Sequence, residues 1–475
     1  MRLGRPPNLP RRRSSAARVD LPDIQGNVLR GYSHPTAAYL FLRILDPDRA
    51  RALMTRMLPQ VVTAEPWAGA PPDTALHVSF TFAGLSALGL PAAVLDSFPA
   101  EFREGMAARA ERLGDRGPSA PEHWEAGLGT GEAHALVTVY AVDDERLDAA
   151  REALRGVGDG AVSLVHEQRA AALEGTRDHF GFADGIAQPD VQGSGVAPRP
   201  GDGQPDGAGR WRAVRTGEFL HGYEDEDGRL AQAPAAPLDR NGTFMVYRKL
   251  QMDVAAFRRF VAEQGQRYPG GADLLGAKIV GRWPDGTPLE VSPDRPEPAI
   301  ASDPARINDF VFRDDADGLR CPIGAHIRRA NPRDSDGFFD GRLANRHRLI
   351  RRGRSYGPPM PVGVLEDDGV DRGLVFVCFN ASIWRQFETV QALWIDDGDP
   401  FGLGPDKDPL VGEPHGTVGK MTIQGTPPHF VRPLPRFVTM RGGEYLYRPS
   451  LSGLRWLSSE AYSGDGGPAS SRPGR

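Results

Sequence analysis

The order of strand-like and helix-like segments is the feature of this sequence that most constrains its fold. In the first half, apolar stretches of strand length alternate with amphipathic stretches of helical period. The strand-like stretches are 38–45, 75–82, 134–142 and 162–166, and the helical ones are 48–58, 83–90 and 144–154. Apart from the short helical stretch 83–90, the order is strand, helix, strand, strand, helix, strand, which predicts a ferredoxin-like unit.

The second half opens in the same way. Phe244–Lys249 has strand composition, and Asp253–Glu263 follows it with an amphipathic helical pattern. Later, Gly373–Phe379 predicts another buried strand, followed by a helix from Ser382 to about Trp394. We therefore expect two related α+β domains with antiparallel sheets, spanning 20–235 and 236–460.

The remaining segments favour loops and tails. Residues 193–240, 265–320 and 396–430 are loop-rich. Residues 1–19 predict a flexible basic arm, with six arginines in the first 18 residues and no apolar run of the kind that a signal peptide or membrane helix needs. Residues 461–475 predict a disordered tail.

Composition excludes several classes of protein. A formal net charge of −5 gives no case for nucleic-acid binding. Two cysteines cannot build a disulfide framework or a cysteine-based zinc site, which fits a reducing compartment, with a cysteine-poor secreted protein as the alternative. We expect a cytoplasmic protein that does not associate with membranes, and a homo-oligomer stays open.

The segment Cys321–Gly357 holds the chemistry-bearing residues at highest density. Its histidine, His326, follows Ile323-Gly324-Ala325, where small residues let a flat macrocycle approach the backbone. One proximal imidazole commonly holds haem iron and leaves the opposite face open. The alternative is an ordinary surface or core histidine.

Two further groups could act on a bound peroxide. Asp184, in Gly181-Phe182-Ala183-Asp184-Gly185, could move a proton between the peroxide oxygens, although the segment could also be a simple turn. Arg351 belongs to a run of arginines that could be only a basic face. A fixed guanidinium would also stabilise the negative charge that develops when the O–O bond breaks.

These strings resemble the dye-decolourising peroxidase family, in its longer-chain branch. The resemblance is carried by GAHIRRANPR around His326, by DHFGFADGIAQP around Asp184, by DIQGNVLRGY near the N-terminus, and by the closing segment that begins at Arg436. Many relatives have arginine where this chain has Ala183. The resemblance implies two ferredoxin-like domains, with a haem pocket mainly in the C-terminal one. It also implies His326 as axial ligand, Asp184 as distal acid–base group and Arg351, the first arginine of Arg-Arg-Gly, as charge stabiliser.

Other pocket roles are assigned less directly. Glu388, on the predicted helix after Gly373–Phe379, is our candidate for accepting the second ring N–H of His326. Arg329, Arg333 and His347 are candidates to pair with haem propionates, and the neighbouring arginines compete with them. The resemblance places Leu374 and Phe376 over the distal face. Cys378 shares their strand parity, and we expect a neutral, buried thiol there.

We therefore predict a peroxidase with one haem b per chain. Hydrogen peroxide would be the oxidant, and dyes, phenols or similar organic donors would be oxidised in one-electron steps. The alternative is a haem carrier or haem-processing protein with little turnover, for which neither Asp184 nor Arg351 is needed. A protein without haem that binds calcium or phosphate is disfavoured, because the sequence contains no EF-hand spacing or P-loop.

Overall fold

The computed structural model describes residues 18–157, 160–206, 209–335, 337–338, 341–413 and 419–459. The predicted basic arm, apart from its last two residues, and the predicted 461–475 tail lie outside these ranges. No helix within the described ranges is long and apolar enough to cross a membrane.

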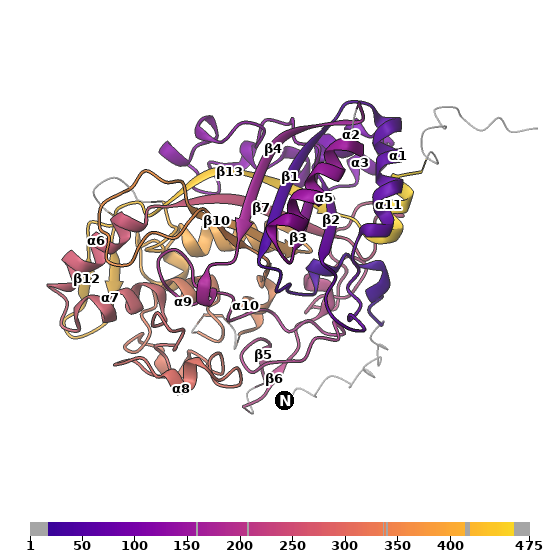
Figure 1. Ribbon diagram of the computed structural model, residues 1–475. Coiled ribbons are helices and arrows are strands. Elements are labelled where there is room, and N and C mark those ends of the chain that lie inside the picture. The colour runs from indigo at the N-terminus through magenta and orange to yellow at the C-terminus, as the bar shows by residue number, and fades with distance from the viewer. Residues whose placement is uncertain are drawn as a thin grey trace, which may run out of the picture.

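The centre of the molecule is one nine-stranded antiparallel sheet to which both halves of the chain contribute. Figure 1 shows the strands of the two halves lying next to one another. The strands are β1 (Thr36–Ile44), β2 (Thr74–Phe80), β3 (Ala135–Ala141), β4 (Val162–Ala171), β7 (Thr243–Met252), β8 (Ile350–Arg351), β9 (Arg354–Tyr356), β10 (Gly373–Asn380) and β13 (Val438–Arg448). Their order is β4-β1-β3-β2-β13-β7-β10-β8, with β9 also paired to β10, so the halves join where Tyr447 of β13 pairs with Phe80 of β2.

The first half confirms the predicted ferredoxin-like unit. Its strand order is β4-β1-β3-β2. The helices are α1 (Pro47–Met57), α2 (Phe82–Ala87), α3 (Ala92–Asp96), α4 (Ala100–Glu104) and α5 (Asp144–Val157). The two connecting helices, α1 and α5, pack in the same hydrophobic cluster against the sheet. Helix α1 begins where predicted because the Asp46 side chain accepts hydrogen bonds from the backbone N–H groups of Asp48 and Arg49.

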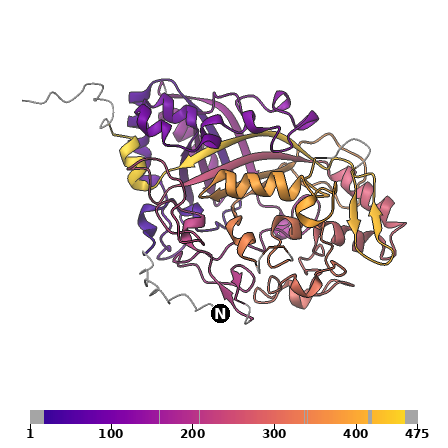
Figure 2. The ribbon, with the colours of Figure 1, turned by 180° about the vertical axis from the view of Figure 1, so that it is seen from behind.

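The second half repeats this order as β13-β7-β10 with β8 and β9 at the edge. Its helical segments are α6 (Val254–Gly265), α7 (Gly271–Val280), α8 (Pro298–Ala301), α9 (His326–Ala330), α10 (Arg342–Arg346), η11 (Ile383–Glu388), η12 (Val390–Ile395) and α11 (Leu451–Leu457). Segments η11 and η12 are π-helical and together confirm the predicted 382–394 helix. Figure 2 shows this helical stretch in orange along the sheet.

Two short hairpins complete the described fold. Strands β5 (Gln204–Pro205) and β6 (Trp211–Arg212) lie in the predicted 193–240 loop region. Strands β11 (Met421–Ile423) and β12 (His429–Val431) lie in the predicted 396–430 region. These two segments therefore contain little regular structure, as expected, whereas the predicted 265–320 loop region contains the ten-residue helix α7.

Strand β13 is the main element that the sequence patterns did not reveal. It contains Gly442 with φ of +150°, and its register against β7 shifts between Met440 and Gly442. A bulge of this kind interrupts the two-residue alternation by which a strand is recognised. The α+β class with two ferredoxin-like units is confirmed, and the domain boundary at 235/236 stays a prediction.

Candidate functional site

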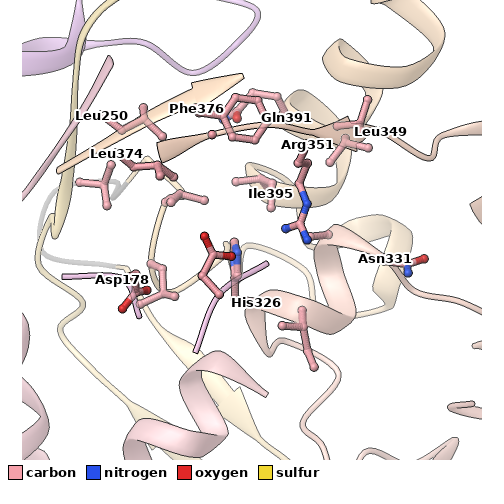
Figure 3. A pocket seen from close by; sticks show the side chains of 18 of the residues that line it. Asp178, Leu250, His326, Asn331, Leu349, Arg351, Leu374, Phe376, Gln391 and Ile395 are labelled. Carbon is pink, nitrogen blue, oxygen red and sulfur yellow. The ribbon is translucent and has the colours of Figure 1, made fainter. Parts of the chain in front are cut away.

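A cavity of about 380 Å³ lies between the second-half sheet and the helices α7, α9 and η12. Most of its lining residues come from the second half, and the 178–189 segment closes one side. Figure 3 shows His326 and the guanidinium group of Arg351 directed into the same space. The volume is that of a small-molecule or cofactor pocket.

His326 is the first residue of α9 and lies on the cavity wall. Its Nδ1 is 2.9 Å from Oδ2 of Asp408, and the side chain of Asp408 is fully buried. Burial disfavours the charged ring, but the carboxylate outweighs this effect and raises the pKa of His326. Donation from Nδ1–H to the carboxylate leaves Nε2 free to bind a metal.

The expectation that Glu388 supports His326 is wrong. Glu388 pairs with Arg109, whose Nη2 is 2.6 Å from Oε2, and it accepts a hydrogen bond of 3.0 Å from the Tyr445 hydroxyl. The buried Glu388 carboxylate therefore joins η11, in the second half of the chain, to Arg109 in the first half. Asp408 occupies the position beside the imidazole, because the 396–413 loop returns to α9, where Arg329 donates to the Asp406 carbonyl.

Asp184 lines the cavity from the 178–189 segment. Its backbone N–H donates to the Thr176 carbonyl at 2.9 Å, which closes the turn that carries it. A second carboxyl group, Asp178, lies on the same segment and also lines the cavity. Burial raises the pKa of Asp178 to about 7, although the N–H of Phe182 donates to its carboxylate at 2.9 Å.

Arg351, in β8, is fixed against the segment that carries Asp184. Its backbone N–H donates to Oε1 of Gln188 at 3.0 Å, and its guanidinium group donates to the Ala187 carbonyl at 2.8 Å. The structure therefore places the acid and the guanidinium group in one cavity with His326. These bonds also hold the guanidinium group in a set position, as charge stabilisation requires.

Leu374 and Phe376 of β10 line the cavity, as the strand parity and the family resemblance predicted. Cys378, two residues further along β10, is fully buried and is not among the residues that line the cavity. Burial raises the pKa of its thiol well above the ordinary range, which agrees with the expected neutral thiol.

Of the residues expected to pair with anionic groups, Arg333 lines the cavity and the other two, Arg329 and His347, do not. Arg333 lines the cavity together with Arg282 and Arg348, and all three side chains are buried. Burial lowers the pKa of Arg333 to about 9 and that of Arg282 and Arg348 to about 10, because it disfavours the charged guanidinium groups. An anion bound beside these side chains would therefore stabilise their charged form.

Arg329 and His347 do not line the cavity, which corrects two expectations. Arg329 donates to the backbone carbonyls of Trp394 and Asp406 at 2.6 Å and joins α9 to the following loops. His347 Nδ1 bonds the backbone carbonyl of Arg385. Both therefore contribute to packing around the site and do not reach into it.

Asp408 and Asp178 were not identified from the sequence. Asp408 lies 82 residues after His326 in an acidic, loop-rich segment, where no spacing marks one carboxylate among several. Asp178 begins the DHFGFADG string and could have been noticed as a second carboxylate near Asp184. A pair of titratable groups in one cleft is a general signal of a functional site.

Comparison with known proteins agrees with this geometry. Residues 23–172 match the family model described as "DyP dimeric alpha+beta barrel domain", and residues 224–401 match "Dyp-type peroxidase, C-terminal". The chain is 30% identical over 473 residues to the dye-decolorizing peroxidase msp1 of Mycetinis scorodonius, covering 94% of this chain and 89% of that one. It is also 30% identical to the multifunctional dye peroxidase DyP2 of an Amycolatopsis species, covering 92% and 96%.

A solved structure described as a dye-decolorizing peroxidase in complex with 2,6-dimethoxyphenol aligns with a TM-score of 0.79. It is 26% identical and covers 93% of this chain and 100% of its own.

Proposed function

The chain belongs to the dye-decolourising peroxidase family and is a haem-dependent peroxidase, and from this premise we propose that His326 ligates the iron of one haem b per chain. We assign Asp184 and Arg351 to the opposite face, where peroxide would bind. The observation that carries this assignment is the contact of 2.9 Å between His326 and the buried Asp408 carboxylate, on the wall of a cavity that Asp184 and Arg351 also line.

The residues present fit a haem. Nε2 of His326 is available for iron, since Nδ1 is committed to Asp408. Leu374 and Phe376 provide an apolar wall. Arg282, Arg333 and Arg348 are buried cations that donate to backbone carbonyls and to the Asn308 side chain, and they would pair with the propionates.

When bound, the haem supplies the redox centre that takes two oxidising equivalents from peroxide and returns them in one-electron steps to an organic donor. Asp184 accepts the proton from the near peroxide oxygen and delivers it to the far one, so that water can leave. Arg351 stabilises the negative charge that develops on the departing oxygen. Asp408 holds the imidazole ring of His326 and increases its basicity.

Phenols and dyes are the donors that we propose. A similar solved peroxidase is described in complex with 2,6-dimethoxyphenol, and several full-length relatives are named for decolourising dyes. A haem carrier needs neither a fixed arginine nor a distal carboxylate, so the presence of both in one cavity favours catalysis over storage.

The test is the reaction of the haem-loaded protein with one equivalent of peroxide, followed by stopped-flow absorbance. Asp184→Asn and Arg351→Leu should keep the haem spectrum and slow the peroxide reaction by about 100-fold or more. His326→Ala should lose the spectrum of the ligated iron. Wild-type rates in both distal variants would refute the assignment of Asp184 and Arg351.

A further inference from the structure

The cavity continues beyond the residues described so far into a side chamber. We define this chamber by six lining residues: Leu113, Asp115, Ser119, Arg248, Gln391 and Met440. In the sheet, Leu374 pairs with Leu250, which pairs with Met440, so Met440 lies two strands away from Leu374. Two strand spacings amount to about 10 Å. The chamber therefore extends sideways from the space beneath Leu374 and Phe376.

The arginine side chains of this region are already paired. Arg248 binds both carboxylate oxygens of Asp115, with its Nη1 at 3.0 Å from Oδ2. Arg436, beside the chamber, binds both carboxylate oxygens of Glu413 and also donates to the Ser119 hydroxyl at 2.9 Å. Because each guanidinium group has a carboxylate partner, the chamber offers a sulfonated dye no uncommitted cation, and a neutral ligand suits it better.

One hydrogen-bond acceptor in the chamber is uncommitted. Gln391 donates from Nε2 to the Leu113 carbonyl at 3.3 Å, which orients the amide. Within the described ranges, no group donates to its Oε1, and the side chain is half-buried on the cavity wall (Figure 3). Apolar side chains of Leu113 and Met440 complete the surface. An aromatic ring with one hydroxyl group matches this combination.

A second, surface cavity shares two lining residues with the cavity that contains the chamber. Gly114 and Asp396 line both cavities. Gly114 has φ of +78°, and a Cβ there would lie 1.6 Å from Oδ2 of Asp396, so only glycine allows the two segments to approach this closely. Gly114 and Asp396 therefore belong to both cavities, and Arg112, Arg116 and Lys407 also line the surface one.

We propose that the side chamber is a binding subsite for small, uncharged phenols, which donate their hydroxyl hydrogen bond to Oε1 of Gln391. The ring lies against Leu113 and Met440, beside the haem space. Larger or sulfonated dyes do not use this subsite. The inference rests on the proposed peroxidase function and adds the class of donor that binds at this end of the cavity.

The test is calorimetric titration of the haem-loaded enzyme with 2,6-dimethoxyphenol in the absence of peroxide. Gln391→Leu keeps the size and removes the acceptor, and should weaken binding by about fivefold, as expected for one lost neutral hydrogen bond. Gln391→Phe fills the chamber and should weaken binding by at least about tenfold. The KM for the phenol should rise in both variants, whereas the KM for a sulfonated dye should not.

Thr389→Ala, on the same helical stretch but outside the residues that line the cavity, is the matched control and should bind the phenol like the wild type. Unchanged phenol affinity in both Gln391 variants would overturn the inference, as would equal effects on phenol and sulfonated dye. The haem spectrum and the rate of the peroxide step are recorded for each variant. If they fail in the wild type, the proposed function is wrong, and if they hold while phenol binding is unaffected, only the subsite is wrong.

Discussion

Replacement of Asp408 by asparagine should weaken haem binding without disturbing the cavity. The Asp408 carboxylate is fully buried and accepts three hydrogen bonds. Oδ2 accepts from Nδ1–H of His326 at 2.9 Å, and Oδ1 accepts from the N–H groups of Leu410 at 2.9 Å and Val411 at 3.0 Å. Asparagine has one acceptor oxygen. In either orientation, its NH₂ group therefore faces a donor.

The size of the effect follows from what is lost. A hydrogen bond to a charged group contributes about 1.5–3 kcal/mol, and loss of such a partner behind a metal-ligating histidine typically costs about 10–100-fold in affinity. We expect the dissociation constant for haem to rise by about that factor in Asp408→Asn. A less basic imidazole also stabilises ferric iron less, so the reduction potential should move upward.

Haem titration of the apoprotein and spectroelectrochemistry measure the two quantities. Asp406→Asn is the matched control, because Asp406 is equally buried but pairs with Lys420 and the Thr422 N–H. Glu388→Gln should also leave both quantities unchanged, since Glu388 pairs with Arg109. Wild-type haem affinity and potential in Asp408→Asn, or an equal loss in Asp406→Asn, would refute the reasoning.

Three further predictions concern the rest of the molecule. Arg248→Met should destabilise the fold by about 3–5 kcal/mol, because it leaves the buried Asp115 carboxylate unpaired, and adding Asp115→Leu should restore most of the loss. Chemical denaturation measures both, and a double variant as unstable as the single one would count against the argument. Burial raises the pKa of Glu444 from 4.5 to about 8, so the folded protein retains a proton that the unfolded chain releases. Stability should therefore fall between those pH values as pH rises, by up to about 1.4 kcal/mol per unit, and Glu444→Gln should flatten the slope; an unchanged slope in urea titrations at pH 5, 6.5 and 8 would contradict this. Cys321 and Cys378 should resist a thiol reagent in the folded protein and react after denaturation, because both are buried and burial raises the pKa of Cys321 to about 12; fast labelling of the native protein would disprove it.

Much of the fold was predictable because it depends on local pattern. Hydrophobic alternation and helical period located β1, β7 and β10 and the helices that follow them. The pattern failed at β13, where the bulge at Gly442 breaks the alternation. Nothing local could show that β13 also pairs with β2 and so joins the two halves in one sheet, because that contact brings together residues 80 and 447.

The same division holds for the site. His326, Asp184 and Arg351 stand in short strings whose residue types already suggest the chemistry, and the sequence alone was sufficient to nominate them. The residue types alone did not show which of the surrounding side chains support them in the cavity. Arg329 and Arg333 are four residues apart and chemically identical, yet only Arg333 lines the cavity, because α9 ends between them and Arg333 takes a left-handed backbone conformation with φ of +50°.

The amino-acid sequence by itself determined the order of the elements and the identity of the reactive side chains, since both depend on neighbouring residues. Only the tertiary structure decided that Asp408, not Glu388, supports His326, that Arg282 and Arg348 join Arg333, and that the cavity extends to Met440. These features depend on which distant loops approach one another. That approach is set by the packing of the whole chain, which no single segment encodes.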